Sequence, residues 1–105
     1  MVRGEVFRLR VPRGTRGSEL RGARYAVVVQ ADELLALSTV LVSPTSTAAP
    51  PRSFRPTIEL EGAPTRVLVE QTTAVSPERL GESVGRLSAS ELRELDTGLA
   101  LVLGL

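Results

Sequence analysis

The chain has 105 residues, of which 42% are hydrophobic, 24% charged and only 3% aromatic, with a net charge of +1. It contains no cysteine, histidine or lysine, so all thirteen basic residues are arginine. These absences exclude an imidazole base, a thiolate nucleophile, a lysine Schiff base, a disulfide framework and a zinc site of nitrogen and sulfur ligands. The length predicts one domain over residues 1–105, and we expect neither a metal nor a cofactor.

The arginines are concentrated at one end of the chain. Residues 1–24 contain seven arginines and two glutamates, whereas residues 70–105 contain three arginines and six acidic residues. A GC-rich coding bias accounts for the use of arginine in place of lysine, but not for this clustering. Because guanidinium offers a planar fork of donors that suits phosphate, the basic first quarter favours a phosphate-bearing partner.

Nothing in the sequence indicates a membrane protein. No apolar run reaches the roughly 20 residues needed to cross a bilayer, and the segment MVRGEVFRLR alternates instead of forming a signal-peptide core. We therefore expect a soluble cytoplasmic protein without membrane contact.

In the first half of the chain, hydrophobic alternation predicts short strands. Residues 2–11 alternate as a strand does, and residues 12–22, rich in glycine and arginine, predict a loop. Residues 24–30 predict a buried strand and residues 31–37 a short connection. Residues 38–43 predict another strand, which leads into a proline-rich loop.

The second half continues with strands and ends in a helix. Residues 55–61 and 65–71 predict strands around a turn at residues 62–64, residues 76–80 a single helical turn, and residues 84–87 a short strand. Ser88 and Glu91 fit a capping box, and the following leucines repeat at helical spacing to the end. Five or six short strands with one terminal helix favour a mainly β (α+β) fold, either a small barrel or a strongly bent sheet.

Polar side chains at the predicted strand ends are the candidate site. Arg24 opens the second strand, Thr45 and Ser46 follow the third, Glu70 closes a later one, and Glu19 lies in the predicted first loop. If these ends converge, a guanidinium, hydroxyls and carboxylates meet at one point. Cleavage of RNA by its own 2′-hydroxyl requires a proton acceptor, stabilised phosphoryl charge and a protonated leaving oxygen, which these groups supply. A strand-edge salt bridge, a turn cap and a solvated carboxylate are the alternative interpretations of the same residues.

Six short motifs favour the catalytic interpretation over the structural ones. In chain order they are Arg3-Gly-Glu-Val, Thr15-Arg-Gly-Ser-Glu19, Arg24-Tyr-Ala-Val-Val-Val, Pro44-Thr-Ser46, Val69-Glu-Gln71 and Gly85-Arg-Leu-Ser88. Together with the terminal helix, the chain resembles the MazF/PemK toxins of type II toxin–antitoxin modules over its whole length. The resemblance implies an SH3-like, CcdB/MazF-like small β-barrel that acts as a homodimer. It also implies metal-independent cleavage of single-stranded RNA and neutralisation by a MazE-like antitoxin.

The resemblance assigns roles to individual residues. Arg24 matches the catalytic arginine of the family, Thr45 or Ser46 its catalytic hydroxyl, and Glu19 the acid of the first loop, with Glu70 as the other candidate proton acceptor. The residues expected to bind RNA are Arg13, Thr15, Arg16, Gly17, Ser18, Arg52, Phe54, Arg55 and Gln71. For Phe54, a role as a core anchor is the alternative to base stacking.

The sequence also departs from the family pattern. Tyr25 stands where the family usually has proline, the Thr-Ser pair follows Pro44 without the usual intervening residue, and Thr73 stands where arginine is common. Loss of that arginine removes the usual phosphate contact, which Arg52 and Arg55 are candidates to replace.

Two other functions remain open at this point. One is a DNA gyrase-binding toxin without nuclease activity, as in the CcdB proteins, although the apolar end of the helix lacks an aromatic tip. The other is a toxin-like fold that is retained only as an interaction module. For the toxin itself, we expect the antitoxin to lay an acidic, largely disordered segment over the arginine-rich groove and to become ordered on binding.

Overall fold

The computed structural model describes residues 1–10 and 24–105. The loop predicted over residues 12–22 therefore lies outside the described residues. The strands are β1 (Glu5–Leu9), β2 (Tyr25–Val28), β3 (Val40–Ser46), β4 (Thr57–Leu60), β5 (Ala63–Val67), β6 (Thr73–Val75) and β7 (Leu80–Arg86). Three 3₁₀ turns, η2 (Asp32–Leu34), η3 (Val69–Gln71) and η4 (Pro77–Arg79), connect them, and the helix α1 (Ala89–Leu103) follows.

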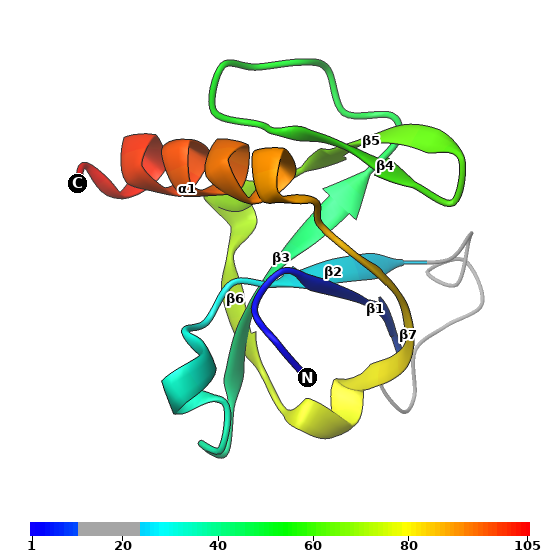
Figure 1. Cartoon of the computed structure of the whole chain (residues 1–105), viewed down its shortest axis with the longest axis vertical. Helices are drawn as coiled ribbons and strands as arrows, with labels where there is room; N and C mark the ends of the chain where they lie inside the picture. Colours follow the sequence, from blue (N-terminus) through cyan, green and yellow to red (C-terminus); the bar gives the residue numbers. More distant parts are fainter. Residues whose placement is uncertain (11–23) are drawn as a thin grey trace.

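The strands form one curled antiparallel sheet, with the helix packed on it (Figure 1). Their order is β4-β5-β3-β2-β1-β7, and β6 pairs with the other end of β3. The long strand β3 thus takes part in both halves of the sheet: its first part pairs with β6 and its last residues with β5. The mainly β fold with a C-terminal helix that we expected is confirmed.

The structure corrects several boundaries predicted from the sequence. The strand predicted over 38–43 continues through Pro44 to Ser46, so Thr45 and Ser46 are strand residues and not loop residues. The strand predicted over 65–71 ends at Val67, and Glu70 lies on the 3₁₀ turn η3. The three-residue strand β6 was not predicted, because its sequence, Thr-Ala-Val, is too short for alternation to identify it.

The turn between β4 and β5 is shorter than the predicted one. Leu60 pairs with Ala63, which leaves only Glu61 and Gly62 in the loop, both with positive φ (50° and 80°). Two-residue hairpin loops require this left-handed backbone at both central positions. The hairpin has an inner face of Ile58, Leu60, Thr65 and Val67 and a more exposed outer face of Thr57, Glu59, Pro64 and Arg66.

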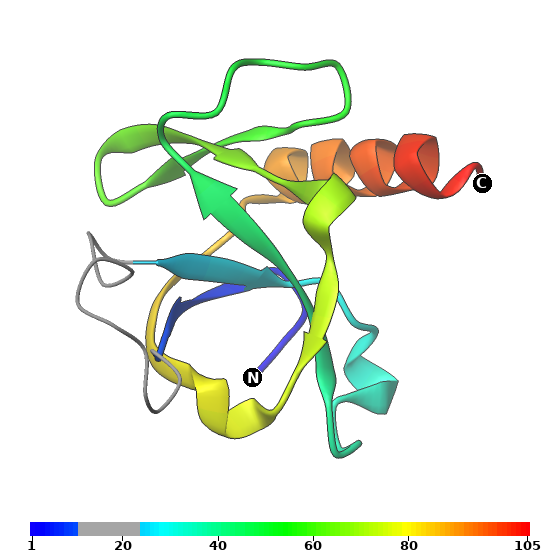
Figure 2. The same ribbon diagram turned by 180° about the vertical axis from the view of Figure 1, so that it is seen from behind.

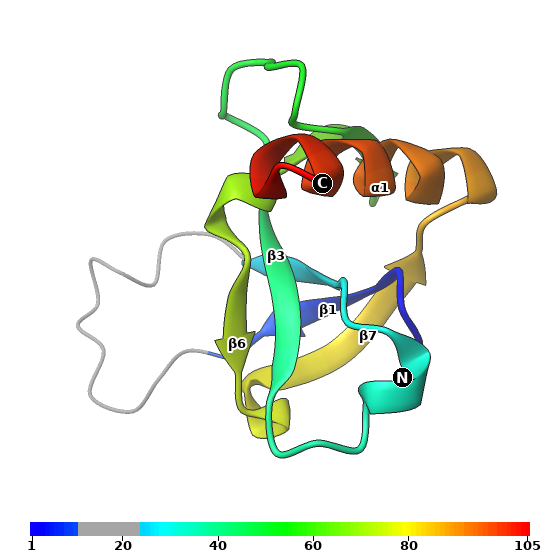
Figure 3. The ribbon, with the colours of Figure 1, turned by 90° about the vertical axis from the view of Figure 1, so that its left-hand side faces the viewer.

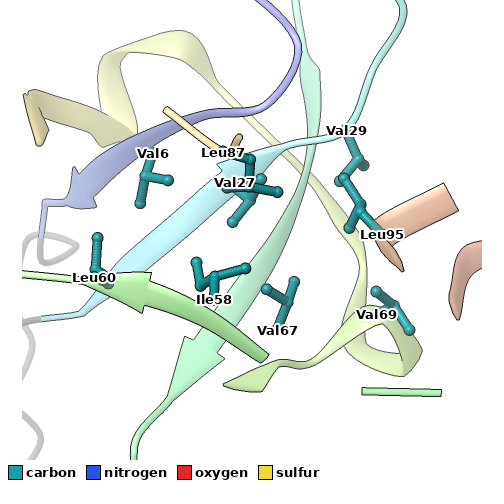
Figure 4. Close-up of a cluster of buried hydrophobic side chains, with 9 residues drawn as sticks. All are labelled: Val6, Val27, Val29, Ile58, Leu60, Val67, Val69, Leu87 and Leu95. Carbon is teal, nitrogen blue, oxygen red and sulfur yellow. The ribbon is translucent and has the colours of Figure 1, made fainter. Parts of the chain in front are cut away.

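Aliphatic side chains fill the core. One cluster joins the sheet to the helix through Val6, Val27, Val29, Ile58, Leu60, Val67, Val69, Leu87 and Leu95 (Figure 4). A second cluster, Ala26, Val28, Val40, Val42 and Leu80, fills the other half of the curled sheet. Successive residues of β2 point alternately into the two clusters, which explains the run of valines that the sequence shows.

The helix begins and ends as its sequence predicts. The Ser88 hydroxyl accepts the N–H of Glu91, whose carboxylate accepts the N–H of Ser88, so the capping box is complete. Gly104 ends the helix in the left-handed conformation. The same Glu91 carboxylate accepts the N–H of Glu59, which attaches the start of the helix to the edge strand β4. Within the described residues, no helix is both long and apolar enough to cross a membrane.

Candidate active site

The candidate catalytic residues Arg24, Thr45 and Ser46 lie at neighbouring strand ends. Arg24 directly precedes β2, and Thr45 and Ser46 are the last residues of β3. Ala26 pairs with Pro44, and Thr45 contacts the Tyr25 carbonyl, so the end of β3 lies beside the start of β2 that Arg24 precedes. The two strand ends that carry these three residues are therefore neighbours, and the Arg24 side chain is exposed to solvent.

The two hydroxyls have different hydrogen bonds. Thr45 Oγ1 donates to the carbonyl oxygen of Tyr25 at 3.3 Å, which uses the hydroxyl proton. Ser46 Oγ accepts the N–H groups of Ala48 and Ala49 at 3.2 and 3.0 Å, which uses the lone pairs, and its proton has no acceptor among residues 1–10 and 24–105. Ser46 thus retains a donor for a ligand, whereas Thr45 ties β3 to β2 beside Arg24.

Glu70 forms an ion pair with Arg55, and this contact was not predicted. The Nε and Nη2 atoms of Arg55 donate to Glu70 Oε2 at 3.0 and 2.5 Å, and both side chains are mostly buried. The hydrogen bonds from Arg55 hold the pKa of Glu70 below its ordinary value, against the opposing effect of burial. The other oxygen, Oε1, is buried and has no hydrogen-bond partner among the described residues.

The proline-rich loop, residues 47–56, lies over the helix (Figure 2). A Cβ on Gly98 would lie 2.6 Å from the carbonyl oxygen of Phe54, so only glycine permits this close approach. Phe54 is partly buried against the core, with the Arg55 guanidinium 5.5 Å from its ring centre. The structure therefore favours the core-anchor interpretation of Phe54 over a free face for base stacking. Arg52 is exposed and donates to the Pro51 carbonyl.

Two features near the strand ends were missed in the sequence. Arg66 pairs with Ser46 across β5 and β3, and its Nε is buried without a hydrogen-bond partner among residues 1–10 and 24–105. Tyr25 has the Arg8 guanidinium over its ring, and a hydrogen bond to Glu61 raises the pKa of its hydroxyl. Neither feature has a local sequence signal, because each depends on pairing between distant strands.

The remaining predicted residues are distributed as follows. Glu19, Arg13, Thr15, Arg16, Gly17 and Ser18 lie outside the described residues, so their expected roles stay predictions. Gln71 is exposed at the end of η3, next to Glu70. In the described part of the chain, no group of three or more aspartate, glutamate, histidine or cysteine side chains is arranged to hold a metal ion.

Comparison with known proteins agrees with this architecture. A Mycobacterium tuberculosis protein named as a candidate toxin is 38% identical, with alignment over 100% of this chain and 99% of its own. Endoribonuclease MazF9 of the same organism is 36% identical over 100% of this chain and 98% of its own. Among solved structures, a mycobacterial endoribonuclease in complex with its cognate antitoxin superposes with a TM-score of 0.82 at 18% identity, covering 100% of this chain and 96% of that one.

These matches give no support to the alternative of a gyrase-binding, CcdB-like toxin. The model of a protein family, described as the PemK-like, MazF-like toxin of type II toxin–antitoxin systems, matches residues 2–103. That match covers the whole of the helix and every strand of the curled sheet. The chain belongs to the PemK-like, MazF-like toxins of type II toxin–antitoxin systems.

Proposed function

We propose that this chain is the toxin of a type II module and a metal-independent endoribonuclease that cleaves single-stranded RNA at specific short sequences in the cytoplasm. The observation that carries the proposal is that Arg24, directly before β2, and Ser46, the last residue of β3, stand at the ends of two paired strands. This supports a site in which a permanently charged guanidinium acts with the Ser46 hydroxyl, whose proton has no acceptor among the described residues. The 36% identity to Endoribonuclease MazF9 over the whole chain supports the same activity.

The reaction needs no group that the chain lacks. A carboxylate, Glu19 or Glu70, takes the proton of the 2′-hydroxyl, and the 2′-oxygen forms a bond to the adjacent phosphorus. The bond from phosphorus to the 5′-oxygen breaks, and that oxygen receives a proton from the protonated carboxyl group through solvent, which gives a 5′-hydroxyl and restores the carboxylate. The other product carries a 2′,3′-cyclic phosphate. Arg24 and Ser46 donate to the phosphoryl oxygens, whose negative charge increases in the transition state.

The exposed apolar side chains support a homodimer. Leu34, Leu37 and Leu41 are exposed around η2 and β3, and Leu101, Leu103 and Leu105 are exposed at the end of the helix. Figure 3 shows that η2, β3 and the C-terminal end of α1 face the same side of the molecule. Burial of this surface in a symmetric dimer removes apolar area from water. In sedimentation experiments we expect a dimer, and Leu41→Glu with Leu103→Glu to shift it to a monomer.

A MazE-like antitoxin is the expected second partner. The solved mycobacterial neighbour is a complex of an endoribonuclease with its cognate antitoxin, and it shares the fold of this chain. An acidic segment that becomes ordered on binding is the partner that best complements exposed arginines such as Arg24 and Arg52.

Incubation of the purified chain with single-stranded RNA in EDTA tests the nuclease assignment. We expect products with 2′,3′-cyclic phosphate and 5′-hydroxyl ends, and a loss of about 100-fold or more in rate for Arg24→Ala. Arg86→Ala is the matched control, because Arg86 is an exposed arginine on the edge strand β7, which β1 separates from β2. Undiminished cleavage by Arg24→Ala would contradict the role of Arg24, and trapped gyrase–DNA complexes with intact RNA would favour the gyrase-binding alternative.

A further inference from the structure

A row of polar side chains crosses the outer face of the sheet from the candidate active site. Ser46 pairs with Arg66, and Arg66 pairs with Thr57, so the three side chains point to the same face of β3, β5 and β4. Neighbouring strands are about 4.8 Å apart, so the row extends roughly 10 Å from Ser46. Arg66 thus provides a second guanidinium on the side of Ser46 opposite Arg24.

The row leads into a groove between the proline-rich loop and the helix. This groove has a volume of about 510 Å³ and is lined by Thr57 of β4, Arg52 and Arg55 of the loop, and Ser90, Arg93 and Thr97 of α1. The outward face of α1 and the loop above it thus contribute three guanidiniums and several hydroxyls to one depression. Glu94 also lines the groove and Arg55 is already paired with Glu70, so Arg52 and Arg93 make the balance of charge positive.

The state of Arg66 points to a ligand that the described residues do not supply. Its Nε is a buried donor without a hydrogen-bond partner among the described residues. An unpaired buried donor is unfavourable, and turning the guanidinium outward toward an anion satisfies it. The anion best placed to do so is a phosphate of an RNA chain that also contacts Ser46, because Arg66 and Ser46 are direct neighbours across β5 and β3.

We infer that Arg66 and the groove around Arg93 form a phosphate track that holds the RNA backbone on one side of the cleaved bond. This inference rests on the proposed nuclease function and extends its site from the strand ends to the helix. A negatively charged antitoxin segment is the competing occupant, but the row of paired side chains continues directly from Ser46 and so favours RNA.

Binding of a fluorescently labelled single-stranded RNA to Arg24→Ala, which keeps the RNA intact, tests the track. Arg66→Gln and Arg93→Gln are added separately to this background, and Arg86→Gln is the charge-matched control. For each of the two test variants, we expect the slope of log affinity against log salt to decrease by roughly 0.7, the value for one lost phosphate contact on a single strand. Thermal melting confirms that each variant is folded.

Cleavage assays on single variants that keep Arg24 locate the track relative to the cleaved bond. Once the cleavage site is mapped, a long oligonucleotide is compared with one truncated to the nucleotides that flank the cleaved bond. Arg93→Gln should lower kcat/KM several-fold on the long substrate and leave the short one unchanged, whereas Arg66→Gln should lower both. The track would be overturned if Arg66→Gln and Arg93→Gln kept the wild-type dependence of RNA affinity on salt. It would also be overturned if both variants kept the wild-type preference for the long substrate.

Two further outcomes separate this inference from the proposed function. RNA binding with the expected slopes but without cleavage by the native chain contradicts the nuclease assignment and leaves the track supported. Unchanged RNA binding by Arg66→Gln and Arg93→Gln, together with weaker inhibition by an acidic antitoxin, assigns the groove to the antitoxin and overturns the track.

Discussion

Arg55 directs two hydrogen bonds to a single oxygen of Glu70, from Nε at 3.0 Å and from Nη2 at 2.5 Å. The second oxygen of the carboxylate is buried and has no partner among the described residues. Arg55 also donates from Nη1 to the carbonyl oxygen of Pro50, so it holds the proline-rich loop to η3. The pair therefore has a structural role whether or not Glu70 also takes a proton in catalysis.

Glu70→Gln distinguishes these two roles. Because the amide keeps the shape of the side chain but loses the charge, we expect a decrease of about 1–3 kcal/mol in the free energy of unfolding. If Glu70 is the base, kcat falls as well, and the low-pH limb of the rate profile disappears. In the native chain that limb lies below the ordinary range for glutamate, because Arg55 lowers the pKa of Glu70. Rate–pH profiles of both forms provide the measurement.

A bell-shaped profile centred near pH 6.5 is not expected in any form of this chain, since that shape reports histidine and the chain has none. Its observation would show that the proton-transfer steps are assigned wrongly. A low-pH limb that is retained in Glu70→Gln would leave Glu19 as the candidate base.

Ser46 and Thr45 are expected to respond differently to substitution. Ser46→Ala removes the free donor and the acceptor for two backbone N–H groups, so kcat should fall by about 10- to 100-fold. Unfolding free energy should decrease by about 1 kcal/mol. Thr45→Ser keeps a hydroxyl for the Tyr25 carbonyl and should retain most of the activity. Single-turnover cleavage with saturating enzyme measures both, and equal losses in the two variants would argue against this division of roles.

Gly98 is the position where the helix and the proline-rich loop come closest. In Gly98→Ala the new Cβ would lie 2.6 Å from the Phe54 carbonyl oxygen and 3.3 Å from Pro56 Cδ. The loop must move away, and we expect a decrease of about 1–3 kcal/mol in stability despite the higher helix propensity of alanine. Thr97→Ala, at an exposed neighbouring position, serves as the control and should be close to neutral. Chemical denaturation measures both, and a stabilised Gly98→Ala would contradict the close contact.

Acid should destabilise the fold partly through Glu91. Burial opposes ionisation of this carboxyl, but hydrogen bonds from the N–H groups of Ser88 and Glu59 keep its pKa below the ordinary 4.5. A pKa that is lower in the folded than in the unfolded state contributes stability above the unfolded value, and this contribution is lost as pH falls through the folded value. Stability should therefore decrease below about pH 4.5.

Glu91→Gln should show a weaker dependence of stability on pH in this range, in urea denaturation at a series of pH values. Glu94→Gln is the control, because Glu94 is an exposed glutamate on the same helix. If the stability of Glu91→Gln depended on pH as that of the native chain does, Glu91 would be excluded as the source of the acid sensitivity.

Features that depend on neighbours in the chain could be predicted from the sequence. The capping box of Ser88 and Glu91 and the leucine spacing define α1 within one turn, because helix formation is decided by residues three and four apart. The predicted strands match six of the seven strands at least approximately, and the missed strand β6 owes its existence to pairing with β3. Arg24, Thr45 and Ser46 could be proposed as a group because each stands at the end of an apolar run.

By itself, the sequence determined the chemistry available to this protein: guanidinium, hydroxyl and carboxylate groups without imidazole, thiol or amine side chains. Only the tertiary structure decided how these groups are paired. The partner of Glu70 is Arg55, and the neighbour of Ser46 is Arg66, because the register of strands far apart in the chain sets which side chains meet. That register is fixed by burial of one face of each strand in a shared core, an interaction that no short stretch of sequence contains.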